Sequence, residues 1–130
     1  MSGGMQIHMT VTGAEEVLAK LQHLEAAARG ELLLTALTAG GELISNAAKG
    51  YAPVKTGNLR RSIHVEPGEA SGSGASVQIG TNVSYSRFVE LGTRHMSARP
   101  YLRPAADGQK AAVLNEVKTS LWDLLRAQLG

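Results

Sequence analysis

The sequence predicts one α+β domain in which a small antiparallel sheet packs against two or three amphipathic helices. Apolar and polar residues alternate from Met5 to Val11, which is the pattern of a half-buried strand. Apolar residues recur at steps of three and four along residues 31–51 and 104–130, as on the buried face of a helix. The chain has 130 residues, enough for one hydrophobic core, and only 4% of them are aromatic. We therefore expect a core formed mainly by Leu, Val, Ile and Ala.

Charge is unevenly distributed along the chain. Thirteen Lys and Arg residues against eleven Asp and Glu residues give a net charge of +2. The balance is two cations to five acids in residues 1–48, eight to three in residues 49–103, and three to three in residues 104–130. Positive charge is thus concentrated in the middle, although the total alone is too small to indicate nucleic-acid binding.

Composition also excludes several classes of protein. The absence of cysteine excludes disulfides, thiolate metal sites and cysteine nucleophiles, and it agrees with a reducing cytoplasm. The start, MSGGMQIHM, lacks the basic region and apolar run of a signal peptide. No apolar run approaches the ~20 residues that span a bilayer. We expect a soluble protein without membrane contact.

The N-terminal half predicts two helices after the first strand. Residues 12–15, Thr-Gly-Ala-Glu, form a capping box at the start of the first helix. Its apolar face consists of Val17, Leu18, Leu21 and Leu24. The second helix is expected from about Glu31 to Pro53, where the proline ends it. Its apolar face consists of Leu33, Leu37, Gly40, Ile44, Ala47 and Tyr51, and its polar face of Glu31, Thr35, Thr38, Glu42, Ser45 and Lys49.

Two adjacent glycines, Gly40 and Gly41, lie in the interior of the second helix. Each costs a helix about 1 kcal/mol relative to alanine. Either another backbone approaches closely at this point, or the helix is weak or kinked there, and the sequence leaves both explanations open.

The middle of the chain predicts a turn and then a hairpin. Residues 54–58 suit a turn in which Gly57 or Asn58 takes a positive φ. One strand is expected around Ile63 and Val65, and the next contains Ala75, Val77 and Ile79. Residues 67–76 between them are rich in Gly and Ser, so we expect a long flexible loop in the hairpin.

The last third predicts a loop and a helix. Residues 83–91 fit either a strand or a helical turn, of which we favour the turn, and residues 92–100 form an irregular basic loop. Pro104 suits the first turn of a last helix, and Trp122 lies beside that helix's apolar stripe. We expect Trp122 to contact the edge of the core rather than to anchor an exposed interface. The stripe consists of Leu114, Val117, Leu121 and Leu124.

No group of residues indicates catalysis. The histidines, which are His8, His23, His64 and His95, have no metal-ligand spacing. Glu90 is the one acid in the basic run of residues 77–103, and we expect an ion pair with an arginine rather than a general acid or base. The candidate partners are Arg87, Arg94 and Arg99. The sequence therefore predicts no enzymatic activity, no cofactor and no metal site.

Two basic loops remain as candidates for binding. The first carries Lys55, Arg60 and Arg61, and the second carries Arg87, Arg94, Arg99 and Arg103. Arginine pairs bidentately with carboxylate and with phosphate. A carboxylate-rich protein surface and a nucleic acid both suit these loops, although few aromatic residues lie nearby to stack on bases. An ordinary solvated surface is the third interpretation.

Two segments, APVKTGNLRRSI and YSRFVELGTRHMSARPYLRPA, resemble the signature of a phage tail-component family named for gene product ten of a lambdoid siphophage. The similarity lies in the order and spacing of Pro53, Thr56-Gly57, Leu59, Ser62-Ile63, Gly80, Tyr85, Val89-Glu90, Gly92-Thr93, Ala98-Arg99-Pro100 and Leu102-Arg103-Pro104-Ala105. Lys55 departs from the family, in which an acid is frequent at this position, so a contact at that turn can be particular to this phage.

The resemblance implies a structural virion protein that acts in tail completion and head-tail joining. It implies a hexameric ring at the head-proximal tail end or neck, assembled in the host cytoplasm from subunits that can stay monomeric in solution. Its partners would be further copies of itself, the tail tube and the head-neck connector proteins, with DNA only passing through the tail channel. The alternative function is a small basic nucleic-acid-binding module.

The motif residues fall into two groups under this interpretation. We expect subunit or partner contacts from Lys55, Thr56, Arg60, Arg61, Arg87, Arg94, Arg99 and Arg103. We expect support of the fold from Pro53, Gly57, Leu59, Ile63, Tyr85, Glu90, Gly92, Pro100 and Pro104.

Overall fold

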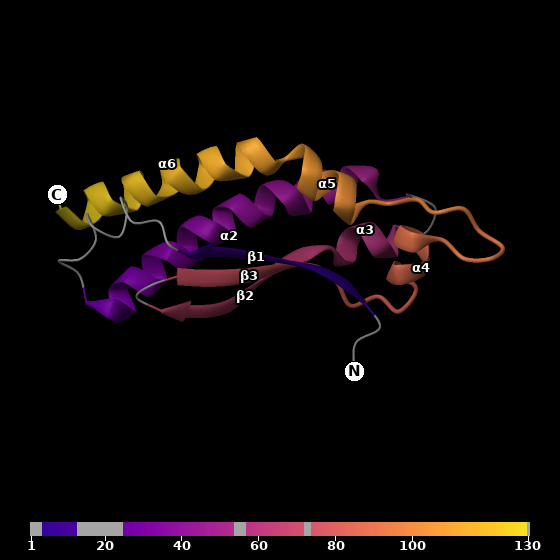
Figure 1. Ribbon diagram of the computed structural model, residues 1–130, viewed down its shortest axis with the longest axis horizontal. Coiled ribbons are helices and arrows are strands. Elements are labelled where there is room, and N and C mark those ends of the chain that lie inside the picture. The colour runs from indigo at the N-terminus through magenta and orange to yellow at the C-terminus, as the bar shows by residue number, and fades with distance from the viewer. Residues whose placement is uncertain (1–3, 13–24, 54–56, 72–73, 130) are drawn as a thin grey trace.

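The computed structural model describes residues 4–12, 25–53, 57–71 and 74–129. A long helix, α2 (Ala26–Tyr51), lies between a three-stranded sheet and a second long helix, α6 (Lys110–Leu129) (Figure 1). Three short helices gather at the end of the molecule where α2 stops. They are α3 (Asn58–Ser62), α4 (Ser86–Leu91) and α5 (Leu102–Gly108). The α+β class predicted from the sequence is confirmed.

The sheet is antiparallel, with β3 (Gly74–Thr81) in the centre and β1 (Met5–Thr12) and β2 (His64–Ser71) at its edges. Alternate residues of β3 are buried in the core: Ala75, Val77 and Ile79. The partly buried Met5, Ile7 and Met9 of β1 pack against the same core. The strand predicted from the alternation in residues 5–11 is thus confirmed.

The hairpin between β2 and β3 is present, but the long loop predicted over residues 67–76 is wrong in its extent. β2 continues to Ser71 and β3 begins at Gly74, with a register shift between Pro67 and Ala70. Proline is tolerated here because β2 is an edge strand, which needs partners on one side only. Gly and Ser indicated a loop because they bury little apolar surface. Backbone pairing with β3 nevertheless keeps residues 67–71 in β2.

Helix α2 begins at Ala26, five residues before the predicted start, and is continuous across the two glycines. A Cβ on Gly40 would lie 2.8 Å from Val117 Cγ2 of α6, and a Cβ on Gly41 would lie 3.2 Å from Val65 Cγ1 of the sheet. Each glycine therefore faces one of the two layers that enclose α2. Close approach, rather than a kink, explains the glycine pair, although side chains make the closest contacts.

Two positions on α2 were predicted wrongly. Tyr51 is exposed although it continues the predicted apolar face, and Ser45 is buried although it belongs to the predicted polar face. Ser45 is buried because α2 packs on two sides, so its buried surface is wider than one stripe. Tyr51 is the last residue of α2, and the buried surface continues there through Ala48 and Ala52 instead.

The last helical segment is interrupted at Gln109, between α5 and α6, and Pro104 lies in the first turn of α5. Leu114 was predicted to be part of the buried stripe but is 57% exposed. The buried residues of α6 are spaced by four: Val113, Val117, Leu121 and Leu125. Leu114 lies about 100° around the helix from Val113, on the side away from α2.

Some predictions concern residues outside the described ranges. The helix predicted after the capping box, with its apolar face from Val17 to Leu24, is one of them. Within the described ranges, no helix has the length and apolar character to cross a membrane.

Candidate interaction surface

One end of the molecule collects arginines from both basic segments. α3 follows the end of α2, α4 follows β3, and the irregular segment 92–100 connects α4 to α5 (Figure 1). Six arginines lie on these elements: Arg60, Arg61, Arg87, Arg94, Arg99 and Arg103. We call this surface the arginine end.

Gly57 sets the direction of α3. Its φ of 65° is in the left-handed region that glycine adopts without strain, so the predicted positive φ in this turn is confirmed at Gly57. Ser62, at the end of α3, has its hydroxyl 2.7 Å from the Leu59 carbonyl oxygen and in contact with the Thr81 hydroxyl. Thr81 Oγ1 also accepts the amide of Val83 at 3.1 Å. These bonds hold α3 against the segment that leads into α4.

The segment 92–100 is fixed at both of its ends. Gly92 has a φ of 77°, and a Cβ there would lie 2.7 Å from the backbone nitrogen of Ala98. The amide of Arg99 donates to the Val89 carbonyl at 2.7 Å, and Thr93 pairs with Met96 in an isolated bridge. The irregular loop predicted here is confirmed. Its backbone hydrogen bonds fix the backbone positions of Arg94 and Arg99.

Glu90 binds backbone amides rather than an arginine. Its Oε1 accepts the amides of Tyr101 at 3.0 Å and Leu102 at 2.8 Å, and its Oε2 accepts the amide of Arg103 at 3.3 Å. The side chain is buried, and no ion pair of Glu90 occurs among the described residues. The ion pair predicted for Glu90 is therefore wrong. The carboxylate instead caps the free amides at the start of α5, where the helix dipole also favours negative charge.

Tyr101 lies beneath the arginine end. It is completely buried, and its hydroxyl donates to the Ser86 carbonyl at 3.2 Å. Burial raises the pKa of the phenol to about 12, since the phenolate would lose its hydration. Tyr101 and Glu90 together join α4 to α5, so the two helices at the ends of segment 92–100 are fixed relative to each other.

Five of the six arginines are exposed to solvent. Arg61, Arg87, Arg94, Arg99 and Arg103 are exposed, while Arg60 is half-buried with its Nε lacking a hydrogen-bond partner. None of the six forms an ion pair with a carboxylate within the described residues. Glu90, the acid nearest in sequence to Arg87 and Arg94, is buried and engaged with amides. The exposed Asp107 lies four residues after Arg103 on α5 and forms no ion pair with it. The arginine end therefore presents positive charge that the described part of the chain does not neutralise.

An apolar hollow of about 360 Å³ lies beside Arg103 at the arginine end. Met5 and Ile7 of β1, Leu91 of α4, and Leu102 and Ala106 of α5 line it, together with Arg103 and Glu90. Leu91 is 64% exposed and Phe88 is 55% exposed on the same helix. Sequence reasoning missed this apolar component because its lining comes from β1, α4 and α5, which are distant in sequence.

His64 forms a smaller polar cluster at the start of β2. Its Nδ1 lies 2.6 Å from the Ser62 carbonyl oxygen and its Nε2 lies 2.7 Å from Glu66 Oε1. The hydrogen bond to Glu66, followed by that to Ser62, raises the pKa of His64 above 6.5. Within the described residues, no group of three His, Asp or Glu side chains could hold a metal ion.

The remaining motif residues are placed as follows. Leu59 and Ile63 are fully buried, in agreement with a role in the fold, and Pro53, Tyr85 and Pro104 are half-buried. Pro100 is exposed. Lys55 and Thr56, two of the predicted contact residues, lie outside the described residues.

A family model described as "Bacteriophage HK97-gp10, putative tail-component" matches residues 15–92, which is more than half of the chain. The protein belongs to this family of phage tail components. It is therefore a structural protein of the phage tail, as the two motif segments indicated. No curated protein and no solved structure matches the chain significantly.

The tail-component match covers only part of the arginine end. It includes α2, α3, the hairpin and α4 and stops at Gly92, so three of the six arginines lie beyond it. These three are Arg94, Arg99 and Arg103. The Glu90 cap crosses this boundary, since Glu90 lies inside the matched segment and its amide partners outside.

Proposed function

We propose that this tail component acts at the head-proximal end of a long non-contractile tail, where it completes the tail and joins it to the filled head. In this proposal it forms a hexameric ring on the tail tube, with contacts to neighbouring copies and to head-neck connector proteins, and DNA only passes through the channel. Its site of action is the virion neck after assembly in the host cytoplasm. The role is that of docking rather than catalysis.

The arginine end carries this proposal. Six arginines without carboxylate partners in the described residues lie at one end of the molecule, and one of them, Arg103, lines an apolar hollow. The Glu90 cap and the Ser62–Thr81 contact fix the elements that carry them. An apolar centre with a charged rim is the usual composition of a protein interface. Solvated arginines alone would not require the rigid attachment of segment 92–100.

The test is electron microscopy of lysates in which the gene has been deleted from the parent phage or prophage, with the gene supplied in trans as the control. We expect filled heads beside separate, full-length tails, because joining fails after both parts are complete. Complementation with the wild-type gene should restore joined particles. Ordinary joined particles without the gene would contradict the proposal.

A triple variant tests the arginines within the same assay. Arg61→Ala with Arg94→Ala and Arg99→Ala changes three exposed side chains and leaves the half-buried Arg60 in place. The protein should fold normally but complement the deletion poorly. Full complementation by this variant would show that the arginine end is an ordinary solvated surface.

Nucleic-acid binding is the second candidate, and the unneutralised charge of the arginine end is the observation that favours it. The aromatic residues do not support stacking on bases, because Tyr101 is buried and Phe88 is the only exposed aromatic on α4. A duplex-DNA binder would lose affinity with salt at a slope of about −0.9 per phosphate contacted. Absence of a DNA complex at low salt would remove this candidate.

A further inference from the structure

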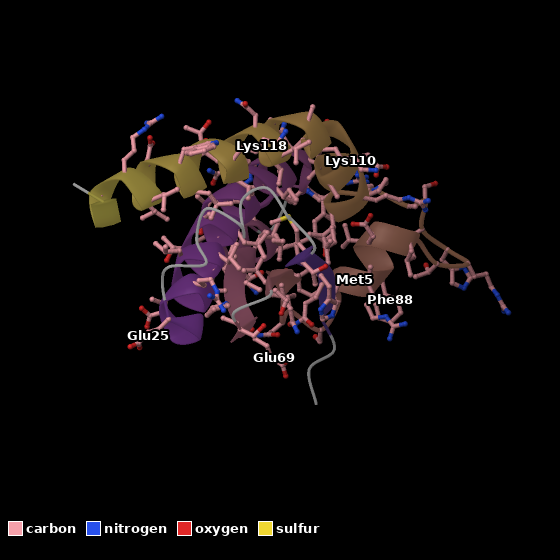
Figure 2. All side chains as sticks on the ribbon, turned by 60° about the vertical axis from the view of Figure 1, so that its left-hand side comes forward. Met5, Glu25, Glu69, Phe88, Lys110 and Lys118 are labelled. Carbon is pink, nitrogen blue, oxygen red and sulfur yellow. The ribbon has the colours of Figure 1, made fainter. Side chains whose placement is uncertain are left out.

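Opposite to the arginine end lies a surface with exposed acids. Glu25 and Glu31 lie at the N-terminal end of α2, and Glu69 lies near the end of β2. These two segments are in contact, because a Cβ on Gly30 would lie 3.0 Å from the Ser71 carbonyl oxygen. Glu25 and Glu69 are labelled in Figure 2, as is Phe88 on α4. We call the surface formed by Glu25, Glu31 and Glu69 the acidic end.

The two ends do not neutralise each other within one molecule. Helix α2 has 26 residues and separates them by roughly 39 Å at 1.5 Å per residue. Charges in water are screened over about 8–10 Å at physiological ionic strength. The two ends therefore do not screen each other, and among the described residues of the acidic end three acids outnumber one cation, the half-buried Arg29.

This separation favours one kind of contact between copies. Two arginine ends brought together would place up to twelve like charges in one interface, which opposes a symmetric contact through that surface. An arginine end against an acidic end joins opposite charges instead. Such a head-to-tail contact leaves a free surface at each side, so it continues into a ring or a filament.

The two ends also differ in shape. Segment 92–100 projects from the arginine end (Figure 1) and carries Met96, which is 41% exposed, between Arg94 and Arg99. A hollow of about 290 Å³ lies at the hairpin end of the sheet. Thr10 of β1, Glu69 of β2 and residues 70–71 and 74–76 line this hollow. Met96 and the neighbouring Arg94 and Arg99 thus complement this hollow in shape and charge, because the hollow is concave and contains the carboxylate of Glu69.

We propose that copies of this chain associate head to tail, with Met96 of one copy in the hairpin hollow of the next and Arg94 and Arg99 beside its acidic end. The place of this contact in a tail ring rests on the proposed function, whereas the contact itself is a property of the purified protein. The occupant of the hollow is therefore a second copy of this chain.

Charge-reversal variants test the contact by sedimentation of the purified protein at low and high salt. Arg94→Glu with Arg99→Glu reverses one side, and Glu31→Lys with Glu69→Lys reverses the other. Wild type should associate at low salt and dissociate at high salt. Each variant alone should associate more than about tenfold more weakly, because like charges then face each other.

The decisive measurement is an equimolar mixture of the two variants. Every contact in an alternating assembly again joins opposite charges, so association should return to near the wild-type level, which also shows that both variants are folded. Lys118→Glu is the control, since Lys118 is exposed in the middle of α6 and belongs to neither end. This control should associate like wild type.

Met96→Ser tests the hollow separately from the charges. It should weaken association without changing its dependence on salt, and an unchanged association constant would overturn the placement of Met96. A wild-type protein that stays monomeric at low salt up to its solubility limit would overturn the whole contact, as would a mixture that does not associate. If gene deletion still separates heads from tails in that case, the proposed function stands and only the head-to-tail contact fails.

Discussion

The carboxylate of Glu90 lies 2.8 Å from the backbone nitrogen of Leu102, across a sequence separation of twelve residues. This bond joins α4 to α5 and determines where segment 92–100 begins and ends. The arginines on α4, segment 92–100 and α5 depend on it, whereas those on α3 are held by the Ser62 and Thr81 bonds. One buried acid therefore positions a surface that is otherwise basic.

Replacing Glu90 should destabilise the protein. Glu90→Ala leaves the amides of Tyr101 and Leu102 buried without an acceptor, so we expect the free energy of unfolding to fall by about 2–4 kcal/mol. Glu90→Gln keeps one carbonyl oxygen at the position that accepts both amides and should lose less. Urea denaturation followed by circular dichroism measures both variants.

The control for this prediction is Glu42→Ala, which removes an exposed acid from the middle of α2. Its effect should stay within about 0.5 kcal/mol. Equal stability of Glu90→Ala and Glu42→Ala would contradict the capping role.

Two glycine-to-alanine changes in α2 should have opposite effects. Gly40→Ala places a methyl group 2.8 Å from Val117 Cγ2 and 3.1 Å from Val113 Cγ1, so we expect a loss of about 1–3 kcal/mol through overpacking. Gly50→Ala meets no atom within 4 Å and should gain up to about 1 kcal/mol from helix propensity. Chemical denaturation gives both values. Stabilisation by Gly40→Ala would show that α6 packs less closely on α2 than described.

The sequence predicted elements whose apolar pattern is regular and failed where tertiary packing decides. The alternation in residues 5–11 indicated β1, and the three-and-four spacing indicated α2 and α6. The same spacing could not show that α2 packs on both sides, which buries Ser45, or that Ala48 and Ala52 rather than Tyr51 are buried at its C-terminal end. It also could not distinguish Leu114 from Val113, because both are apolar and either one lies three or four residues before Val117.

The candidate site was predictable only in its charges. Proline, glycine and arginine spacing identified the two basic segments, but their meeting at one end depends on the sheet that brings α3 beside α4. The partner of Glu90 was mistaken because charge composition suggests arginine, whereas backbone amides eleven to thirteen residues away carry no signal in the sequence. The apolar hollow was missed for a related reason, since its lining comes from three separate elements.

His64 should titrate above its ordinary range. Both ring nitrogens face acceptors, the Ser62 carbonyl and Glu66 Oε1, so the doubly protonated ring is favoured and its pKa is raised. A raised pKa in the folded state stabilises the protein below pH 6.5, and this contribution is lost as the pH rises through the folded-state pKa. The gain is small because the side chains of His64 and Glu66 are 43% and 49% exposed.

Nuclear magnetic resonance of the His64 ring protons measures this shift directly. The pKa in wild type should exceed that of the urea-unfolded chain, and Glu66→Gln should lower it, because the strongest cause of the shift is removed. Identical titration of His64 in wild type and Glu66→Gln would contradict the pairing.

Tyr101 should resist ionisation until strongly alkaline pH. Burial raises its pKa to about 12, whereas the phenol of an unfolded chain ionises near pH 10, so the protein loses stability as the pH rises from about 10 toward 12. Tyr101→Phe removes the hydrogen bond to the Ser86 carbonyl and should cost about 1 kcal/mol at neutral pH, where the carbonyl is left without this donor. The same variant should lose less stability between pH 9 and 11 than wild type, because it carries no buried phenol. Urea midpoints measured at pH 7, 9 and 11 compare the two proteins, and parallel loss of stability in both would show that alkaline unfolding has another cause than Tyr101.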